Sequence, residues 1–285
     1  MHGRCFLSGS PSLDGAPVSL MAVVRSALVR DVEQPGWMAD MTDWSRLTHA
    51  YGSAENIPDL LDQLVPDSRA EVWEELWSCI CHQMTVYPAS FAALPRLTEI
   101  ARTWAPEDRT MILSLCGSIV AGARQPHGAG DVRAIHAPEI EELLVLTDET
   151  MHAAIDEDSF TYMLQALLAF ENVPVWDESL DQLAQGEFEL ENCPGCGVHL
   201  FVAIGADGYF ATSGDYAIED DPPKGELAPA LPSGLDLLAR RMYDMAQSLG
   251  RENLAMKLLH LFGDATCPDC RTTFQVADQV IKQYG

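Results

Sequence analysis

Basic residues are scarce in this sequence. Only 17 lysines and arginines stand against 43 aspartates and glutamates among 285 residues, so the formal net charge is -26. A field of this sign repels the phosphate backbone of DNA and RNA, and nucleic-acid binding is therefore not expected. The acidity suits a solvated surface, and beyond that it favours a basic protein partner or mimicry of nucleic acid.

Long apolar runs and targeting segments are also missing. Arg25 interrupts the most apolar N-terminal stretch, residues 18–29, which lacks a basic flank and the length of a membrane span. The chain has eight cysteines, and four of them are scattered, which fits a reducing compartment better than a secreted disulfide framework. These features predict a soluble, cytoplasmic protein without a membrane segment.

Local catalytic motifs are absent as well. The sequence has no Gly-rich phosphate loop, no Gly-x-Ser-x-Gly nucleophile turn and no His-Glu-x-x-His zinc motif. Acidic pairs such as Glu74-Glu75 fit ordinary solvated helix faces. An active site assembled from distant helices leaves no local motif, so these absences favour a non-enzymatic protein and keep an enzyme as the alternative.

Two Cys-Pro-x-Cys pairs, residues 193–196 and 267–270, carry the strongest chemical signal. Four thiolates in two such pairs are the ligand set of a closed tetrahedral zinc site, and the proline in each pair fixes a tight turn. A closed site leaves no position for water or substrate, so it predicts one structural Zn²⁺ and no reaction. The expected ligands are Cys193, Cys196, Cys267 and Cys270.

The spacing of the two pairs is unusual. Seventy residues separate Cys196 from Cys267, whereas compact zinc ribbons have about 15–20 residues between their pairs. Gly197 permits a close backbone approach after the first pair, but Arg271 occupies the equivalent position after the second and weakens the match. Two unrelated reduced pairs, or a disulfide-active Cys-x-x-Cys, are the alternatives.

Other chemistry-bearing residues give weaker signals. Cys79, Cys81 and His82 lie within four residues, but a helix turns Cys81 away from the other two, which favours a packing role. His82, Gln83 and Tyr87 could form a ligand or partner surface, although hydrogen bonds at helix ends are the simpler role. A zinc-related role is open to His199 too, yet strand alternation places it on the solvent side.

The central part of the chain shows helical periodicity. A helix is expected after Asp43, a second opens at Pro58, and a third carries Trp73 and Trp77 on its apolar face. Residues 94–97 (Leu-Pro-Arg-Leu) echo residues 57–60 (Ile-Pro-Asp-Leu), residues 106–115 echo residues 66–76, and a looser copy begins at Pro138. Helix pairs at this period, about 37–40 residues, are typical of HEAT or armadillo solenoids. An irregular helical bundle is the alternative.

Near residue 186 the periodicity changes from helix to strand. Residues 198–204 and 209–212 flank an Asp207-Gly208 turn, which predicts a β-hairpin. The acidic, proline-rich residues 213–233 indicate a loop, and two helices, residues 235–249 and 254–262, follow. The metal would then join the hairpin to the end of the helical pair.

The predicted fold class is therefore mainly α. It comprises a flexible N-terminal extension (residues 1–42), a HEAT-like α-solenoid of helical hairpins (residues 43–185) and a small α+β zinc-ribbon-like module (residues 186–285).

The residues also suggest a family resemblance. Trp44 to Ser53, Leu76-Trp77 with His82-Gln83, and Val86-Tyr87 resemble uncharacterised HEAT-repeat-like proteins of bacteria, especially actinomycetes. The tail, from Cys193-Pro194-Gly195-Cys196-Gly197 to Leu261-Phe262-Gly263 and the second cysteine pair, is similar to the zinc-binding end of that group. The resemblance covers about residues 43–283. It implies a fold rather than an activity, with protein partners or an immunity-type role as the functional analogy.

These observations predict a zinc-stabilised cytoplasmic scaffold or adaptor that binds a protein partner, with an immunity-type inhibitor as one form of it. The rival is an enzyme, with a structural zinc and a role in specialised metabolism. It would bind a small molecule in a pocket on the helical surface around His82 and Tyr87. A deep pocket with convergent polar groups would favour the enzyme, and a broad, shallow acidic groove would favour protein binding. A nucleic-acid-binding zinc protein would need a basic strip that the sequence hardly supplies.

Overall fold

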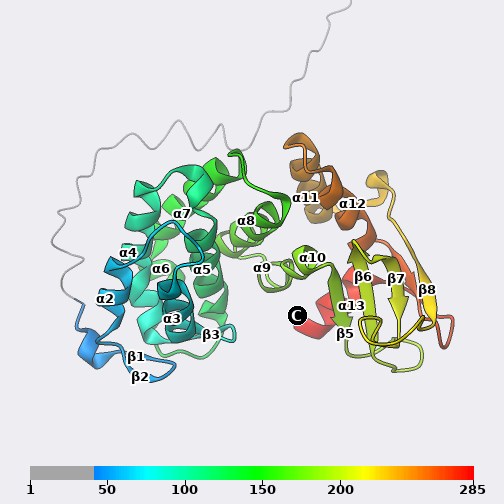
Figure 1. The fold of residues 1–285 in the computed structure, drawn as a ribbon, viewed down its shortest axis with the longest axis horizontal. Coiled ribbons are helices and arrows are strands. Elements are labelled where there is room, and N and C mark those ends of the chain that lie inside the picture. Colours follow the sequence, from blue (N-terminus) through cyan, green and yellow to red (C-terminus); the bar gives the residue numbers. More distant parts are fainter. Residues whose placement is uncertain (1–41) are drawn as a thin grey trace, which may run out of the picture. The chain divides into compact units, whose positions relative to one another are not determined.

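The computed structural model describes residues 42–285, so the predicted flexible extension, apart from Thr42, lies outside the described residues. Helices predominate up to residue 185 (Figure 1). They are α2 (Ile57–Asp62), α3 (Glu71–Ile80), α4 (Pro88–Thr103), α5 (Thr110–Ala121), α6 (Val132–Ile135), α7 (Ala137–Met151), α8 (Glu157–Phe170), α9 (Trp176–Ser179) and α10 (Gln182–Gln185). Two short hairpins pair β1 (Thr48–His49) with β2 (Gly52–Ser53) and β3 (Cys81–His82) with β4 (Thr85–Val86).

A six-stranded antiparallel sheet follows, with strand order β10-β9-β8-β7-β6-β5. It curls into a half-barrel. Its strands are β5 (Glu187–Leu190), β6 (Leu200–Gly205), β7 (Gly208–Thr212), β8 (Lys224–Ala228), β9 (Asp264–Thr266) and β10 (Thr273–Gln275). The helices α11 (Leu237–Ser248), α12 (Glu252–Leu261) and α13 (Val276–Tyr284) accompany it. None of the described helices is long and apolar enough to cross a bilayer.

The predicted fold class, a mainly α HEAT-like solenoid, is wrong, because the six-stranded sheet makes this a mixed helix-and-sheet protein. The repeat rested on equating Pro95 with Pro58. Pro58 lies in the first turn of α2, where its missing N–H leaves no hydrogen bond unmade. Pro95 instead lies inside α4, which began at Pro88, so residues 94–97 do not open a helix. The similarity of these two segments is therefore one of composition and not of structure.

Two local predictions also fail. The helix expected after Asp43 is replaced by a 3₁₀ turn, Trp44–Arg46, and the β1–β2 hairpin. The loop expected over residues 213–233 contains β8, which pairs with both β7 and β9. Gly225 permits this pairing, since a Cβ there would lie 1.7 Å from the carbonyl oxygen of Thr266. Because the residues around β8 are acidic and rich in proline, the sequence pattern indicated a loop where the structure has a central strand.

The hairpin predicted around Asp207-Gly208 is confirmed, with β6 and β7 paired in the register Ile204 opposite Tyr209. Helices α11 and α12 also match the two predicted before the second cysteine pair. Both predictions rest on strong local signals, a two-residue turn and a three-to-four-residue apolar period.

Helix α5 lies at the centre of the helical part, against α4, α7 and α8. Nine of its twelve residues are buried. Gly117 permits the close crossing with α8, because a Cβ there would lie 2.9 Å from Cα of Ala166. Small residues at this crossing bring the two helix backbones together.

The open edge of β5 is covered by α13. Gln283 of this helix accepts a hydrogen bond from the backbone N–H of Glu191 (2.9 Å) and donates one to the carbonyl oxygen of Glu189 (3.0 Å). An unpaired strand edge is a template for aggregation. The amide side chain of Gln283 occupies the hydrogen-bonding groups that another strand would use.

Candidate metal centre and ligand pocket

Four cysteine sulfurs converge at the sheet. The Sγ atoms of Cys193, Cys196, Cys267 and Cys270 all lie within 4.8 Å of one another. Cys193 Sγ is 3.7 Å from Cys270 Sγ, and Cys196 Sγ is 3.9 Å from Cys267 Sγ. A disulfide needs about 2.0 Å between sulfurs, so these are separate thiols. The predicted set comes together as a group that can hold a metal ion.

The two cysteine turns have the same backbone design. The N–H of Gly197 donates to Cys193 O (2.8 Å), and the N–H of Arg271 donates to Cys267 O (3.1 Å). Both residues have a left-handed backbone, with φ of 76° at Gly197 and 64° at Arg271. Arg271 therefore adopts the conformation that glycine adopts in the first turn, at some cost in backbone strain.

Close contact between the two turns explains a further glycine. A Cβ on Gly195 would lie 2.1 Å from Thr272 Oγ1 and 3.0 Å from Cys270 Sγ. The first turn can therefore approach the second only with glycine at this position, which makes Gly195 part of the convergence of the four sulfurs.

The cysteine cluster joins the two edges of the sheet. The first turn connects β5 to β6 and the second connects β9 to β10, and these strand pairs lie at opposite ends of the strand order. The curl of the sheet brings the two ends together. From the sequence, the metal was expected to join a hairpin to a helical pair, whereas in the structure the cluster joins two hairpins across the half-barrel.

Two of these thiols, Cys270 and Cys267, differ in acidity. Hydrogen bonds with Thr272, first of all through its hydroxyl, lower the pKa of Cys270 to about 6. Burial raises the pKa of Cys267 to about 12. Metal ligands must be thiolates, so a bound cation would have to displace the proton of Cys267, and it would displace that of Cys270 more easily.

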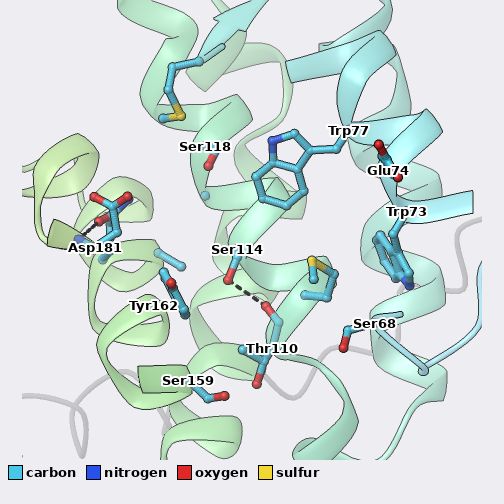
Figure 2. Close-up of a pocket in the computed structure, with 15 residues that line it drawn as sticks. Ser68, Trp73, Glu74, Trp77, Thr110, Ser114, Ser118, Ser159, Tyr162 and Asp181 are labelled. Carbon is cyan, nitrogen blue, oxygen red and sulfur yellow. Dashed lines mark hydrogen bonds between the residues drawn. The ribbon is translucent and has the colours of Figure 1, made fainter. Parts of the chain in front are cut away.

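A second feature is a pocket of about 620 Å³ in the helical part. Figure 2 shows that α3 lies on one side of it and α5 and α8 on the others. Apolar and aromatic side chains make up much of its wall, together with hydroxyl groups from α5, from α8 and from Ser68, which precedes α3. The lining residues are Ser68, Trp73, Glu74, Trp77, Met84, Thr110, Met111, Ser114, Gly117, Ser118, Ser159, Tyr162, Gln165, Ala166 and Asp181.

Each helix presents one face to the pocket. Thr110, Ser114 and Ser118 recur every four residues along α5, and Ser159, Tyr162 and Ala166 follow the three-and-four-residue spacing along α8. Ser114 donates its hydroxyl proton to Thr110 O (2.7 Å). Among the described residues, the hydroxyls of Ser118 and Tyr162 have no hydrogen-bond partner, so both can bond a ligand.

Asp181 and Tyr162 form the polar side of the pocket. The backbone N–H of Asp181 donates to Gln165 Oε1, which ties the start of α10 to α8 (Figure 2). Burial raises the pKa of the Asp181 carboxyl. Burial also raises the pKa of Tyr162, and the negative charge of Asp181 adds to it. The phenol is therefore neutral and a proton donor at physiological pH.

The surface predicted around His82, Gln83 and Tyr87 lies beside this pocket but does not line it. His82 Nδ1 is 3.2 Å from the hydroxyl of Tyr51, and the backbone N–H of Tyr87 donates to Ser90 Oγ (2.8 Å) at the start of α4. Met84, in the same hairpin as His82, does reach the pocket. Gln83 and Met84 form the hairpin turn, with φ of 48° and 63°.

The remaining candidates have no part in the metal centre. Cys79 and Cys81 are buried, and burial raises the pKa of both, that of Cys81 to about 12. His199 Nε2 lies 2.9 Å from Glu189 Oε1, and its side chain is 39% exposed. In residues 42–285 the four cysteines described above are the one group of potential ligands close enough to share a metal.

Sequence reasoning missed the pocket, although one signal was present. Thr110, Ser114 and Ser118 form a polar stripe on a helix that is otherwise apolar and buried. Such a stripe on a central helix requires a polar partner or a cavity. Comparisons with protein-family models, with curated proteins and with solved structures gave no match to this chain.

Proposed function

We propose that this protein binds a small organic molecule in the pocket between α3, α5 and α8. The observation that carries the proposal is the cavity of about 620 Å³ with an apolar, aromatic wall and a few convergent polar groups. Sites for small molecules and cofactors have this size and composition. The hydroxyls of Ser118 and Tyr162, which no neighbour satisfies within residues 42–285, are suited to orient such a ligand.

We further propose that the cysteine cluster holds one structural Zn²⁺. A Zn–S bond of about 2.3 Å places the sulfurs of a tetrahedron about 3.8 Å apart. Two of the six sulfur separations, 3.7 and 3.9 Å, fit that geometry, and all six lie within 4.8 Å. Four thiolates fill the coordination shell, so the metal would take no substrate and would fasten the two ends of the curled sheet.

A screen for ligands tests the pocket. The zinc-loaded full chain and its Ser114→Leu variant, whose larger side chain points into the cavity, are each titrated with a fragment library by ligand-observed NMR. We expect several fragments to bind the wild type and to lose binding in Ser114→Leu. Circular dichroism and melting confirm that the variant is folded. If no fragment binds, or if the fragments bind both proteins equally, the proposal fails.

Protein binding is a second candidate, and the net charge of -26 favours it. A scaffold or adaptor with this charge would attract a basic partner, and all seven described cysteines are free thiols, which suits a reducing cytoplasm. The test is affinity capture of the zinc-loaded chain from its native lysate at two salt concentrations. A stoichiometric basic partner that is lost at high salt supports this candidate, and capture of none argues against it.

A further inference from the structure

The pocket carries charge of one sign. Glu74 lies exposed at its rim and Asp181 is half-buried in its wall, and no lysine, arginine or histidine is among its lining residues in the described part of the chain. Asp156 and Asp158 add negative charge near Tyr162, since both contribute to the raised pKa of its phenol. The electrostatic potential inside the pocket therefore favours a cation.

Aromatic rings provide a second attraction for positive charge. Figure 2 shows the ring of Trp77 projecting from α3 into the pocket and that of Tyr162 facing it from α8. The face of an indole or phenol ring is electron-rich and attracts cations within about 6 Å of its centre. Trp73 donates its indole N–H to Val65 O (3.0 Å), so its hydrogen-bonding capacity is used within the protein.

The carboxylate of Asp181 has no counter-ion within residues 42–285. Its one side-chain partner among the described residues is the amide of Gln185, at 3.3 Å. Asp177, four residues earlier, instead faces Arg124 at 2.6 Å. A carboxylate moved out of water without a cation is costly for the fold. The same segment therefore contains one acid neutralised by the protein and one left for an external charge.

We propose that the ligand of this pocket is an organic cation, in which a protonated amine or quaternary ammonium group is attached to an aromatic or aliphatic body. This inference rests on the proposed function and names its ligand class. The ammonium group lies between the Asp181 carboxylate and the Trp77 ring, and the apolar body fills the space lined by Met84 and Met111. Simple metal ions are disfavoured because so much of the wall is apolar.

Three probes of nearly equal size test the inference: tryptamine, tryptophol and indole-3-acetate. They share the indole and differ in carrying a cation, a neutral hydroxyl or an anion at neutral pH. Their affinities are measured by NMR titration of the zinc-loaded full chain, of Asp181→Asn, and of Asp220→Asn. Asp220 is an exposed acid outside the pocket and controls for the loss of one negative charge. Ser114→Leu reports whether binding is in the pocket.

We expect tryptamine to bind the wild type at least about tenfold more tightly than tryptophol, and indole-3-acetate to bind most weakly. Asp181→Asn should abolish most of the difference between tryptamine and tryptophol, whereas Asp220→Asn should keep it. If tryptophol or indole-3-acetate binds as well as tryptamine, the ligand class is wrong and the proposed function stands. If none of the three binds while fragments of the library bind in the pocket, the ligand class is wrong and the proposed function stands; if Ser114→Leu has no effect on any ligand, both proposals fail.

Discussion

Arg124 and Asp177, which lie 53 positions apart in the sequence, form a bidentate ion pair. Arg124 Nη1 is 2.6 Å from Asp177 Oδ2, and Nη2 is 2.9 Å from Oδ1. The carboxylate of Asp177 is fully buried, and Arg124 also bonds Glu178 Oε1 at 3.0 Å. The pair ties the 3₁₀ turn Gly122–Arg124, which follows α5, to α9, the helix that precedes Asp181. It therefore positions the segment that brings a carboxylate to the pocket.

Arg124→Gln should lower the free energy of unfolding by about 2–4 kcal/mol, because it leaves the buried charge of Asp177 without a counter-ion. The control is Arg69→Gln, whose ion pair with Asp67 lies on the surface and whose loss should change stability little, because water screens it. Urea unfolding of both variants measures the difference. Equal losses would show that the Arg124–Asp177 pair is not a structural anchor.

Cys267→Ser should reduce the bound metal to well below one equivalent and lower the melting temperature, because three thiolates no longer close the site. Cys79→Ser is the matched control, since Cys79 is also buried but lies outside the cluster. Elemental analysis by mass spectrometry gives the metal identity and content, and calorimetry gives the melting temperature. A full equivalent of metal in Cys267→Ser, with unchanged melting, would contradict the assignment.

Gly195→Ala should weaken metal binding while all four cysteines remain. The added Cβ would meet Thr272 Oγ1 at 2.1 Å and so push the two cysteine turns apart. Gly234→Ala is the control, because a Cβ at that position meets no atom within 4 Å. Competition with a chromogenic zinc chelator compares the variants. We expect Gly195→Ala to release zinc at a lower chelator concentration than Gly234→Ala and the wild type.

The cysteine cluster was predictable because its signal is chemical and local. Cys-Pro-x-Cys pairs specify a turn and two ligands, whatever the fold around them. It was also predictable that the two cysteine pairs share one site. The sheet that carries them was only partly predicted, because the β6–β7 hairpin was expected and β8 was not. β8 lies among acidic and proline residues, and its central place in the sheet depends on pairing with β9, more than 30 residues later along the chain.

The pocket could not be predicted in the same way. Trp73 and Trp77 follow the apolar period of α3, and the sequence gives no sign that both line a cavity, with Trp73 buried and Trp77 only half-buried. That difference depends on where α5 and α8 cross, which Gly117 and Ala166 set through the closeness of their backbones. Asp181 joins the pocket only through the path of the chain after α8. Periodicity finds buried faces, whereas cavities arise where such faces fail to meet.

Asp181→Asn should make the protein more stable at neutral pH, although it weakens binding of a cation. Burial raises the native pKa of Asp181 above its ordinary value of 3.8. At pH values between 3.8 and the raised native pKa, the native state keeps a proton that the unfolded chain has lost. The contribution of Asp181 to the free energy of unfolding therefore falls as the pH rises through this range. At neutral pH the ionised carboxylate lowers the free energy of unfolding, and the neutral amide does not.

Urea unfolding at pH 7.5, 6 and 5 should show a gain for Asp181→Asn that shrinks toward acid pH. Asp220→Asn should change stability by less than about 0.5 kcal/mol throughout. A loss of stability in Asp181→Asn at neutral pH would mean that the carboxylate is satisfied within the protein and is not held ready for a cation.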